Sequence, residues 1–349
     1  MTKAPFSQDR DESQDKPAGR QHVFSRRNFL IGAGGLVGCG LGAKALLDRR
    51  GAITHADVFI AQAADYDDRL EQKVRGGLSE LGLGPAWVKG KSVLLKPNLV
   101  EPTTKAPHVN THPALVRAVV EVFRRWDARE VFVAEGQGHC RDSYLVLEQS
   151  GLGPVLQQAG VEFVDLNHDE VFTVPNRSMF SKLDDLTLPA TLRRADLIVS
   201  LPKMKTHHWA GATLSMKNLF GVMPGIVYGW PKNVLHWAGI EQSIVDITAT
   251  VRPQLAIVDG VIGMDGDGPI MGNPRRAGVV VMGTNLPAVD ATAARLMELN
   301  PQRIAYLAAA EGRLGPIREG CIEQRGEAIA ALAQRFELLD LPFFAGLRG

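Results

Sequence analysis

The chain of 349 residues has no marked excess of either charge, since 39 lysines and arginines face 38 aspartates and glutamates and the formal net charge is +1. Proteins that wrap nucleic acid rely on a large surplus of basic side chains. The balance is uneven along the chain: residues 1–56 carry nine basic and five acidic side chains, and residues 57–349 carry 30 basic and 33 acidic ones. We therefore expect no nucleic-acid partner and a mildly acidic folded body.

Cysteine is also scarce, and its three occurrences, Cys39, Cys140 and Cys321, include no Cys-x-x-Cys pair. An iron–sulfur cluster bound by four cysteines of this chain is therefore excluded. The sequence also contains no Gly-x-Ser-x-Gly segment, the motif that forms the nucleophile turn of many serine hydrolases, and so it gives little support to a serine hydrolase. The cofactor is left unknown by these absences, with a divalent cation as one possibility.

A long apolar run of the kind that spans a membrane is missing near the N-terminus. Residues 29–43 are uncharged, but they number 15 and include six glycines, whereas a spanning helix needs about 20 strongly apolar residues. This stretch follows Arg26 and Arg27, and together with Phe29 and Leu30 the pair resembles a twin-arginine (Tat) signal. We expect export by the Tat translocase, which carries folded proteins, to the periplasm or to the outer face of the cytoplasmic membrane.

The end of this signal has two interpretations. Leu36-Val37-Gly38-Cys39 resembles a lipobox, in which Cys39 would be acylated and would anchor the N-terminus in the membrane. The other interpretation is a cysteine that falls in the run by chance. In either case residues 1–56 are expected to contain the signal and a linker, and the folded domain begins near residue 57.

From residue 57 onwards, short β-branched runs alternate with longer amphipathic stretches. Several runs, such as Val93-Leu94-Leu95 and Val279-Val280-Val281, are continuously apolar, as expected for strands buried on both faces of a parallel sheet. This alternation predicts an α/β fold, with a mostly parallel sheet, helices on both faces and Rossmann-like layering. The expected strands span residues 57–62, 92–96, 130–134, 161–164, 196–201, 255–259 and 278–283. The expected helices span residues 66–81, 113–126, 239–251 and 287–299, and Thr111 is a candidate cap of the second.

Polar residues follow the expected strands. Lys96-Pro97-Asn98 comes after one strand, Lys203-Met204-Lys205-Thr206-His207 after another, and Asp259 ends a third. Ligands of open parallel sheets bind at the carboxyl ends of the strands, where the loops converge. Long connections over residues 97–112, 202–213 and 260–277 also favour a functional edge.

Taken in order, these segments resemble the signature of the DUF362 family, whose function is uncharacterised. They include Lys96-Pro97-Asn98, Thr111-His112-Pro113, Lys203-Met204-Lys205-Thr206-His207, Leu214-Ser215-Met216-Lys217-Asn218, Asp259-Gly260, Gly268-Pro269 and Val289-Asp290. The resemblance covers about residues 58–314, so we expect a DUF362-like domain over residues 57–315 and a C-terminal extension over residues 316–349 that packs on it. Members of the family sometimes carry a ferredoxin-like iron–sulfur module, which this sequence lacks.

Basic and amide side chains near the strand ends predict a pocket for a small anionic ligand, because cations neutralise it and amides orient it. The alternative is that these lysines pair with nearby acids, as most lysines do. Histidine, with a pKa near working pH, would move protons, and the candidates are His207 and His236. The candidate ligand-binding residues are Lys96, Asn98, His112, Lys203, Lys205, Lys217 and Asn218.

Four carboxylates are candidates for binding a hard divalent cation: Asp259, Asp265, Asp267 and Asp290. Pairing of Asp259 with Lys203 is an equally open interpretation. We expect an exported protein, an enzyme by the first hypothesis, that binds a small anionic substrate or cofactor in a crevice lined by lysine, histidine and asparagine. The alternative is a non-catalytic anion-binding or redox-accessory protein of the cell envelope.

Overall fold

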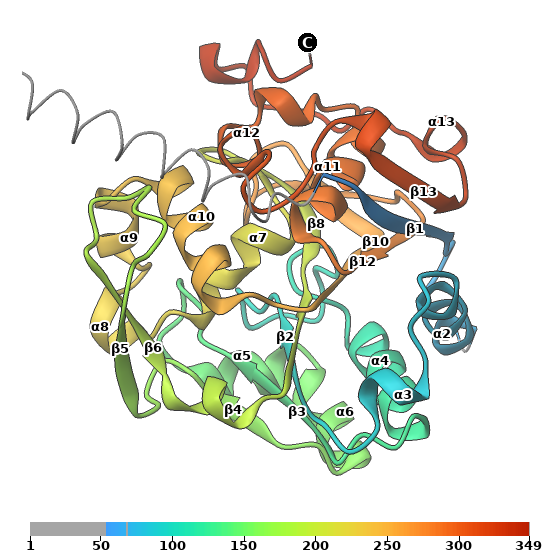
Figure 1. Ribbon diagram of the computed structural model, residues 1–349, viewed down its shortest axis with the longest axis vertical. Coiled ribbons are helices and arrows are strands. Elements are labelled where there is room, and N and C mark those ends of the chain that lie inside the picture. The colour runs from blue at the N-terminus through green and yellow to red at the C-terminus, as the bar shows by residue number, and fades with distance from the viewer. Residues whose placement is uncertain (1–53, 68, 349) are drawn as a thin grey trace, which may run out of the picture. The chain divides into compact units, whose positions relative to one another are not determined.

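The buried runs of the sequence form the centre of one mixed sheet in the computed structural model, which describes residues 54–67 and 69–348 (Figure 1). Its main path has the strand order β13-β1-β12-β10-β7-β2-β3-β4. Strands β8 and β11 pair with β10, and β9 pairs with β8. The strands are β1 (Ala56–Gln62), β2 (Ser92–Pro97), β3 (Glu130–Glu135), β4 (Phe163–Asp165), β7 (Leu197–Leu201), β8 (Lys203–His207), β9 (Gly211–Thr213), β10 (Leu255–Asp265), β11 (Asn273–Arg275), β12 (Val279–Gly283) and β13 (Ile322–Gly326). A separate hairpin joins β5 (Val171–Pro175) to β6 (Asp185–Pro189).

Most neighbouring strands run parallel. The pairs β2 with β3, β2 with β7, β3 with β4, β7 with β10, β8 with β10 and β1 with β13 are parallel. Strand β12 is antiparallel to both of its neighbours, β1 and β10. The mostly parallel sheet predicted from the sequence is therefore confirmed.

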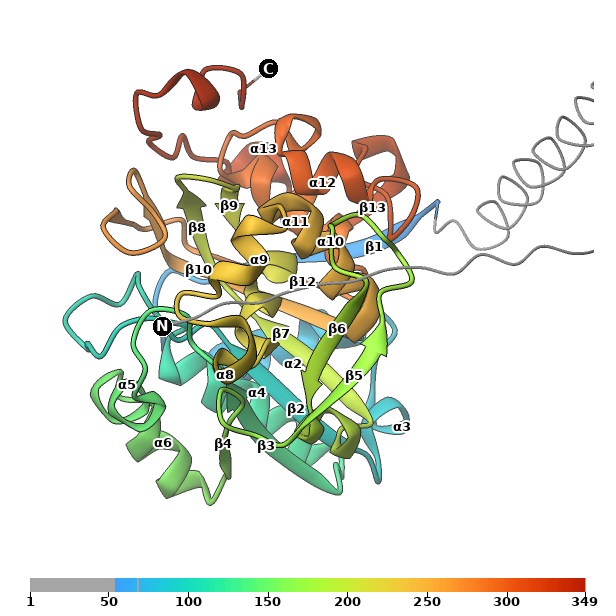
Figure 2. The ribbon, with the colours of Figure 1, turned by 90° about the vertical axis from the view of Figure 1, so that its left-hand side faces the viewer.

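Helices cover both faces of this sheet (Figures 1 and 2), because successive side chains of a strand point to opposite sides. In β2, Leu94 packs in the apolar cluster that contains α10 and α11, whereas Val93 and Leu95 pack in the cluster that contains α2 and α4. The helices are α2 (Leu70–Glu80), α3 (Pro85–Val88), α4 (Pro113–Arg125), α5 (Ser143–Gln149), α6 (Leu152–Ala159), α7 (Ser215–Asn218), α8 (Gly225–Tyr228), α9 (Asn233–Trp237), α10 (Ile240–Val251), α11 (Leu286–Leu296), α12 (Ala305–Ala310) and α13 (Ile329–Leu332).

Two connections expected as loops contain strands. The segment 202–213 forms β8 and β9, and β10 continues beyond residue 259 to Asp265. Because β8 contains two lysines, its sequence resembles a polar loop. The side chains of Lys203 and Lys205 are nevertheless completely buried. A strand with this composition is stable because Lys203 has a carboxylate partner and Lys205 a carbonyl partner inside the protein.

The cap of α4 also differs from the prediction. His112 is the N-cap, and its Nδ1 accepts a hydrogen bond from the amide of Ala114. Thr111 instead joins two strand ends, since its hydroxyl donates to the carbonyl of Leu201 and accepts from the amide of Asn98. This bridge holds the segment after β2 against the end of β7.

The C-terminal part of the chain packs on the same core. Strand β13, at the edge of the sheet, pairs with β1, beginning with Ile322 opposite Ala56. Phe336, Phe344 and Leu347 are buried in the cluster that contains α10 and α11. The division into residues 57–315 and 316–349 stays a prediction.

Candidate functional site

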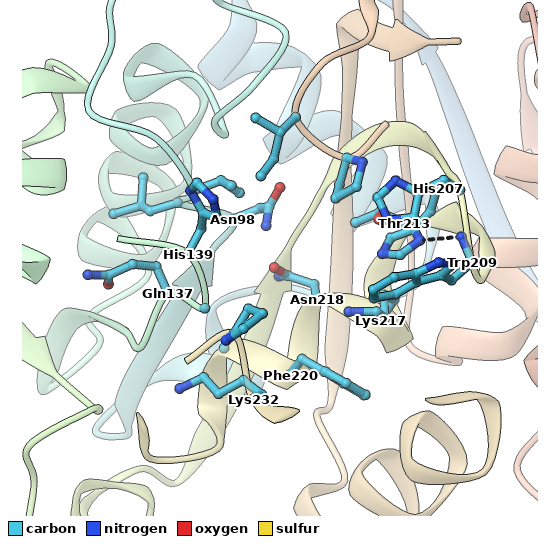
Figure 3. A pocket seen from close by; sticks show the side chains of 18 of the residues that line it. Asn98, Gln137, His139, His207, Trp209, Thr213, Lys217, Asn218, Phe220 and Lys232 are labelled. Atoms are coloured by element: carbon cyan, nitrogen blue, oxygen red, sulfur yellow. Dashed lines mark hydrogen bonds between the residues drawn. The ribbon is translucent and has the colours of Figure 1, made fainter. Parts of the chain in front are cut away.

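A cavity of about 420 Å³ opens where β2 and β3 end, beside β8, β9, α7 and α9, a size within the usual range of small-molecule sites. Figure 3 shows His207, Trp209 and Lys217 gathered on one side, with Asn98, Gln137 and His139 on the other. The structure brings together seven residues that the sequence singled out: Lys96, Asn98, His207, Lys217, Asn218, His236 and Asp267. Six others do not line the cavity: His112, Lys203, Lys205, Asp259, Asp265 and Asp290.

Lys96 forms a buried ion pair in the cavity wall. Its Nζ lies 2.6 Å from Oε2 of Glu135 and 3.0 Å from Oδ1 of Asn218. Glu135 also accepts from the amides of Leu99 and Gly136, and the Asn218 amide donates back to the carbonyl of Lys96. Lys96 and Asn218 are therefore engaged with the protein itself. Sequence reasoning missed Glu135 as the partner, although its position directly after an expected strand was a usable signal.

Lys217, in contrast, has no hydrogen-bond or ion-pair partner among the described residues. Its Nζ lies 3.8 Å from the centre of the Phe220 ring, where the ring face attracts a cation. Burial, helped by the charge of Lys96, lowers the pKa of Lys217 to about 7. Both the neutral amine and the ammonium form are thus populated near neutral pH.

The backbone holds the two candidate histidines in opposite tautomers. Nδ1 of His207 accepts from the amides of Trp209 and Ala210, so neutral His207 carries its proton on Nε2. Nδ1 of His236 lies 2.9 Å from the carbonyl of Lys232, which can only accept, so neutral His236 has a lone pair on Nε2. Burial and the nearby Lys217 lower the pKa of both rings. The cavity therefore offers one neutral donor and one base.

Three lining residues have buried oxygen atoms without hydrogen-bond partners in the described ranges: Oδ1 of Asn98, Oε1 of Gln137 and Oγ1 of Thr213. Buried polar atoms are normally paired. These atoms are suited to orient a bound molecule. Gln137 and Thr213 were not predicted, because neutral polar side chains give no distinctive sequence signal.

Lys232 is a third lysine that lines the cavity, and it was not among the predicted site residues. Burial lowers its pKa to about 7, as for Lys217. Its Nζ, however, donates to Oδ1 of Asn167 and to the carbonyl of Met223, both at 2.5 Å. Lys232 therefore ties the segment before α9 to the loop after β4.

Lys203 and Asp259 form a separate buried cluster. Nζ of Lys203 lies 2.7 Å from Oδ2 of Asp259, which also accepts from the amide of His112. The hydroxyl of Tyr66 donates to Oδ1 of Asp259 at 2.8 Å, and its ring stacks on His112 with centroids 3.6 Å apart. Of the two interpretations of Asp259, the structure has the pairing with Lys203. Tyr66 is a partner that the sequence did not indicate.

The four carboxylates proposed for a cation are not brought together. Asp265 pairs with Arg275 at 2.6 Å, and Asp290 accepts from the amides of Ser215 and Met216 at the start of α7. Asp267 lies 3.5 Å from Nδ1 of His208. No group of three or more histidine, cysteine, aspartate or glutamate side chains within residues 54–67 and 69–348 is arranged to hold a metal ion.

Lys205 is completely buried. Its Nζ donates to the carbonyl of Pro269, a residue of the cavity wall, at 3.1 Å. Burial and the charges of Lys203 and Lys217 lower its pKa well below the ordinary value. The structure therefore places Lys205 behind the wall rather than in the cavity.

The expected Tat signal and Cys39 lie outside the described residues. Among the residues that are described, none of the helices has the length and apolar character needed to cross a membrane.

Comparisons with solved structures give only distant likenesses. The lactate racemase apoprotein from Thermoanaerobacterium thermosaccharolyticum aligns with a TM-score of 0.39 and 14% identity, over 62% of this chain and 52% of that one. A protein from Thermotoga maritima aligns with a TM-score of 0.34 and 15% identity, over 64% of this chain and 58% of that one. The chain thus spans little more than half of either protein.

Comparisons of sequence give one relative and one family model. The Thylakoid-associated protein sll1697 of Synechocystis sp. is 29% identical over 244 residues, which cover 67% of this chain and 71% of the relative. A family model described as Domain of unknown function (DUF362) matches residues 93–295, a range that includes Lys96, Glu135, His207, Lys217 and His236. Since this match spans more than half of the sequence, the chain belongs to the DUF362 family.

Proposed function

We propose that the cavity binds a small anionic substrate and that the protein is an enzyme which transfers a proton on that substrate. The single observation that carries the proposal is the Lys217 amine, which lines the cavity without a carboxylate partner among the described residues. A cation in such surroundings attracts an anion strongly, because little water screens the interaction. Glu135, the buried acid in the wall, is already paired with Lys96.

Two side chains bind the anionic group in this proposal. The ammonium form of Lys217 neutralises its charge, and Nε2–H of His207 donates a hydrogen bond to one of its oxygens. The amide of Asn98, whose Oδ1 has no partner among the described residues, orients the remainder of the molecule. The paired residues Lys96, Lys203 and Asp259 keep these elements in place.

Proton transfer belongs to His236. Its Nδ1 is held by the carbonyl of Lys232, so that Nε2 is the free basic nitrogen of the ring. The lowered pKa keeps this nitrogen unprotonated near neutral pH, which a general base requires. The T-shaped contacts of the ring with Trp209 and Phe220, at 5.5 and 5.6 Å between centroids, hold its orientation.

The site is also proposed to work outside the cytoplasm. Arg26, Arg27 and the uncharged run after them support export by the Tat translocase to the periplasm or to the outer face of the cytoplasmic membrane, with Cys39 as a lipid anchor. The relative in Synechocystis sp. is named as thylakoid-associated. Replacing both arginines by lysine in the full chain should leave the protein in the cytoplasmic fraction, and Cys39→Ala should release exported protein from the membrane. Unchanged export of the lysine variant would contradict the Tat assignment.

Binding is tested with oxalate, a small dianion that has no carbonyl group able to react with an amine. We expect calorimetric titration of the full chain to give one oxalate per chain. Lys217→Met should weaken binding about tenfold or more, the loss of one charge interaction of about 1.4 kcal/mol. The matched control is Lys89→Met, because Lys89 is exposed and does not line the cavity. Equal affinity of the two variants would contradict the proposal.

Catalysis is tested with deuterium uptake from D₂O into the methylene group of malonate. We expect uptake to be faster with the protein than without it. His236→Gln should abolish the acceleration and retain oxalate binding within a few-fold, because glutamine lacks a titratable base. Oxalate binding without any acceleration in the unsubstituted protein would favour the non-catalytic anion-binding alternative.

A further inference from the structure

The amine of Lys217 differs from the other cavity lysines in what surrounds its nitrogen. Nζ of Lys96 has three oxygen partners, and Nζ of Lys232 has two. Nζ of Lys217 has none among the described residues and faces the ring of Phe220 at 3.8 Å. A lone pair on a nitrogen atom that donates to no protein oxygen is free to form a covalent bond.

The surroundings of Lys217 contain the remaining groups that amine addition to a carbonyl needs. His236 supplies a base, and its ring touches the same Phe220 ring as the lysine. His207 supplies a neutral donor for an oxygen, since its Nδ1 is occupied by two backbone amides. Leu99, Val100 and Phe220 add apolar surface to the same lining.

We infer that Lys217 forms a Schiff base with a small carbonyl compound that carries a carboxylate, a 2-oxo acid. This inference names the substrate class of the proposed anion site and rests on that proposed function. The carboxylate occupies the anion position beside His207, which places the adjacent carbonyl carbon within reach of the amine. A cavity of about 420 Å³ leaves space for a substituent on the oxo acid.

The reaction balances without an oxidant or reductant. His236 takes a proton from the Lys217 ammonium, and the Nζ lone pair then attacks the carbonyl carbon. The carbon–nitrogen bond forms, the π electrons move to oxygen, and a proton passes from nitrogen to that oxygen to give a carbinolamine. Protonated His236 returns its proton to the hydroxyl, which leaves as water. The sum is ammonium plus carbonyl to protonated imine plus water.

Several charged groups set the state of this amine. Lys96 on β2 disfavours its ammonium form, and the pKa values of the neighbouring His207 and His236 are lowered. Glu135 on β3 is neutralised by Lys96. Together with burial, these groups bring the pKa of Lys217 to about 7, which leaves a useful fraction of nucleophilic amine near neutral pH.

The experiment uses glyoxylate as the probe, with sodium cyanoborohydride to reduce any imine to a stable secondary amine. The full chain is then digested, and the modified lysine is identified by mass spectrometry. We expect modification of Lys217 at least tenfold above that of Lys232. Lys232 is the internal control, because its pKa is also lowered to about 7 but its nitrogen already donates hydrogen bonds to two oxygens. Modification of both at the same rate, or of neither, would overturn the inference.

A charge-retaining variant separates this inference from the proposed function. Lys217→Arg keeps a cation but cannot form an imine, so we expect it to give no adduct at residue 217, and oxalate titration of the unsubstituted chain tests the anion site by itself. If the unsubstituted chain binds oxalate but gives no reduced adduct, the Schiff base is wrong and the anion site stands. If a Lys217 adduct forms without oxalate binding, the chemistry stands and the anion site is wrong.

Discussion

Two lysines, Lys96 and Lys217, line the same cavity in different surroundings. Lys96 lies 2.6 Å from a carboxylate oxygen of Glu135 and also donates to an amide and a carbonyl. Lys217 has an aromatic ring at 3.8 Å as its recorded partner among the described residues. The protein pairs the buried Lys96 with a carboxylate, whereas the half-buried Lys217 has no carboxylate partner among the described residues.

In this cavity the partners of the nitrogen atom, rather than the residue type, separate a structural lysine from a reactive one. A buried ion pair holds neighbouring elements together, and removing one of its two residues leaves the other buried without a partner. An unpaired cation lowers stability and gains reactivity, a trade that is typical of functional sites.

The largest expected effect is on the paired side. Lys96→Met should lower the free energy of unfolding by about 3–5 kcal/mol, because it leaves the Glu135 carboxylate buried without its cation. Urea denaturation measures the change. The double variant with Glu135→Leu should recover most of the loss, since both charges are then removed. A loss below about 1 kcal/mol in the single variant would contradict the structural assignment of Lys96.

On the unpaired side the same substitution should act in the opposite direction. The folded pKa of Lys217 is about 7 against an ordinary value of 10.5, so between these values the unfolded chain binds the extra proton and stability rises with pH. Lys217→Met should therefore be the more stable protein at pH 6, and its advantage should shrink by up to about 1.4 kcal/mol per pH unit above pH 7. Urea denaturation at pH 6 and 9 tests the sign. A difference that does not depend on pH would contradict it.

A smaller effect is expected in the Lys203 cluster. Tyr66→Phe removes the hydroxyl that donates to Asp259 at 2.8 Å, and an acceptor left unsatisfied costs about 1–3 kcal/mol. Oxalate binding should not change, because neither residue lines the cavity. Thermal unfolding and calorimetry of the same sample measure both. A loss of oxalate binding with intact stability would place this cluster in the site.

The smallest effect concerns a cavity oxygen. Thr213→Val removes a buried hydroxyl that has no partner within the described residues and keeps the shape of the side chain. Stability should rise by no more than about 1 kcal/mol, since no hydrogen bond is lost. The measurement is again urea denaturation. A loss above about 1 kcal/mol would show that the hydroxyl is structurally engaged.

Much of the fold was predictable from local pattern. Runs such as Val93-Leu94-Leu95 became the central strands, because a strand buried on both faces needs apolar side chains at consecutive positions. The β5–β6 hairpin was not predicted, although its residues are largely apolar or β-branched, because each strand has only five residues and ends in a proline. Strand β8 was missed as a strand because Lys203 and Lys205 look solvent-exposed when read in isolation.

The candidate site was predictable as a place but not as a set of roles. Parallel strands end at one edge of a sheet, and this places Lys96 and Asn98 in one cavity with residues more than 100 positions later, including Lys217. The neutralisation of Lys96 by Glu135 depends on the register of β2 and β3, and no local pattern encodes that pairing. The histidine tautomers depend on backbone groups that each ring meets only in the folded chain.

Local composition alone thus set the alternation of elements, the location of the polar edge and the family resemblance, because periodicity and strand-end polarity are properties of neighbouring residues. The tertiary structure decided which lysines pair with a carboxylate and which lysine nitrogens have no hydrogen-bond partner among the described residues. The energy of a buried charge depends on atoms within a few ångströms in space, whatever their distance along the chain. Lys96 and Lys217 are equivalent as letters and differ only through those atoms.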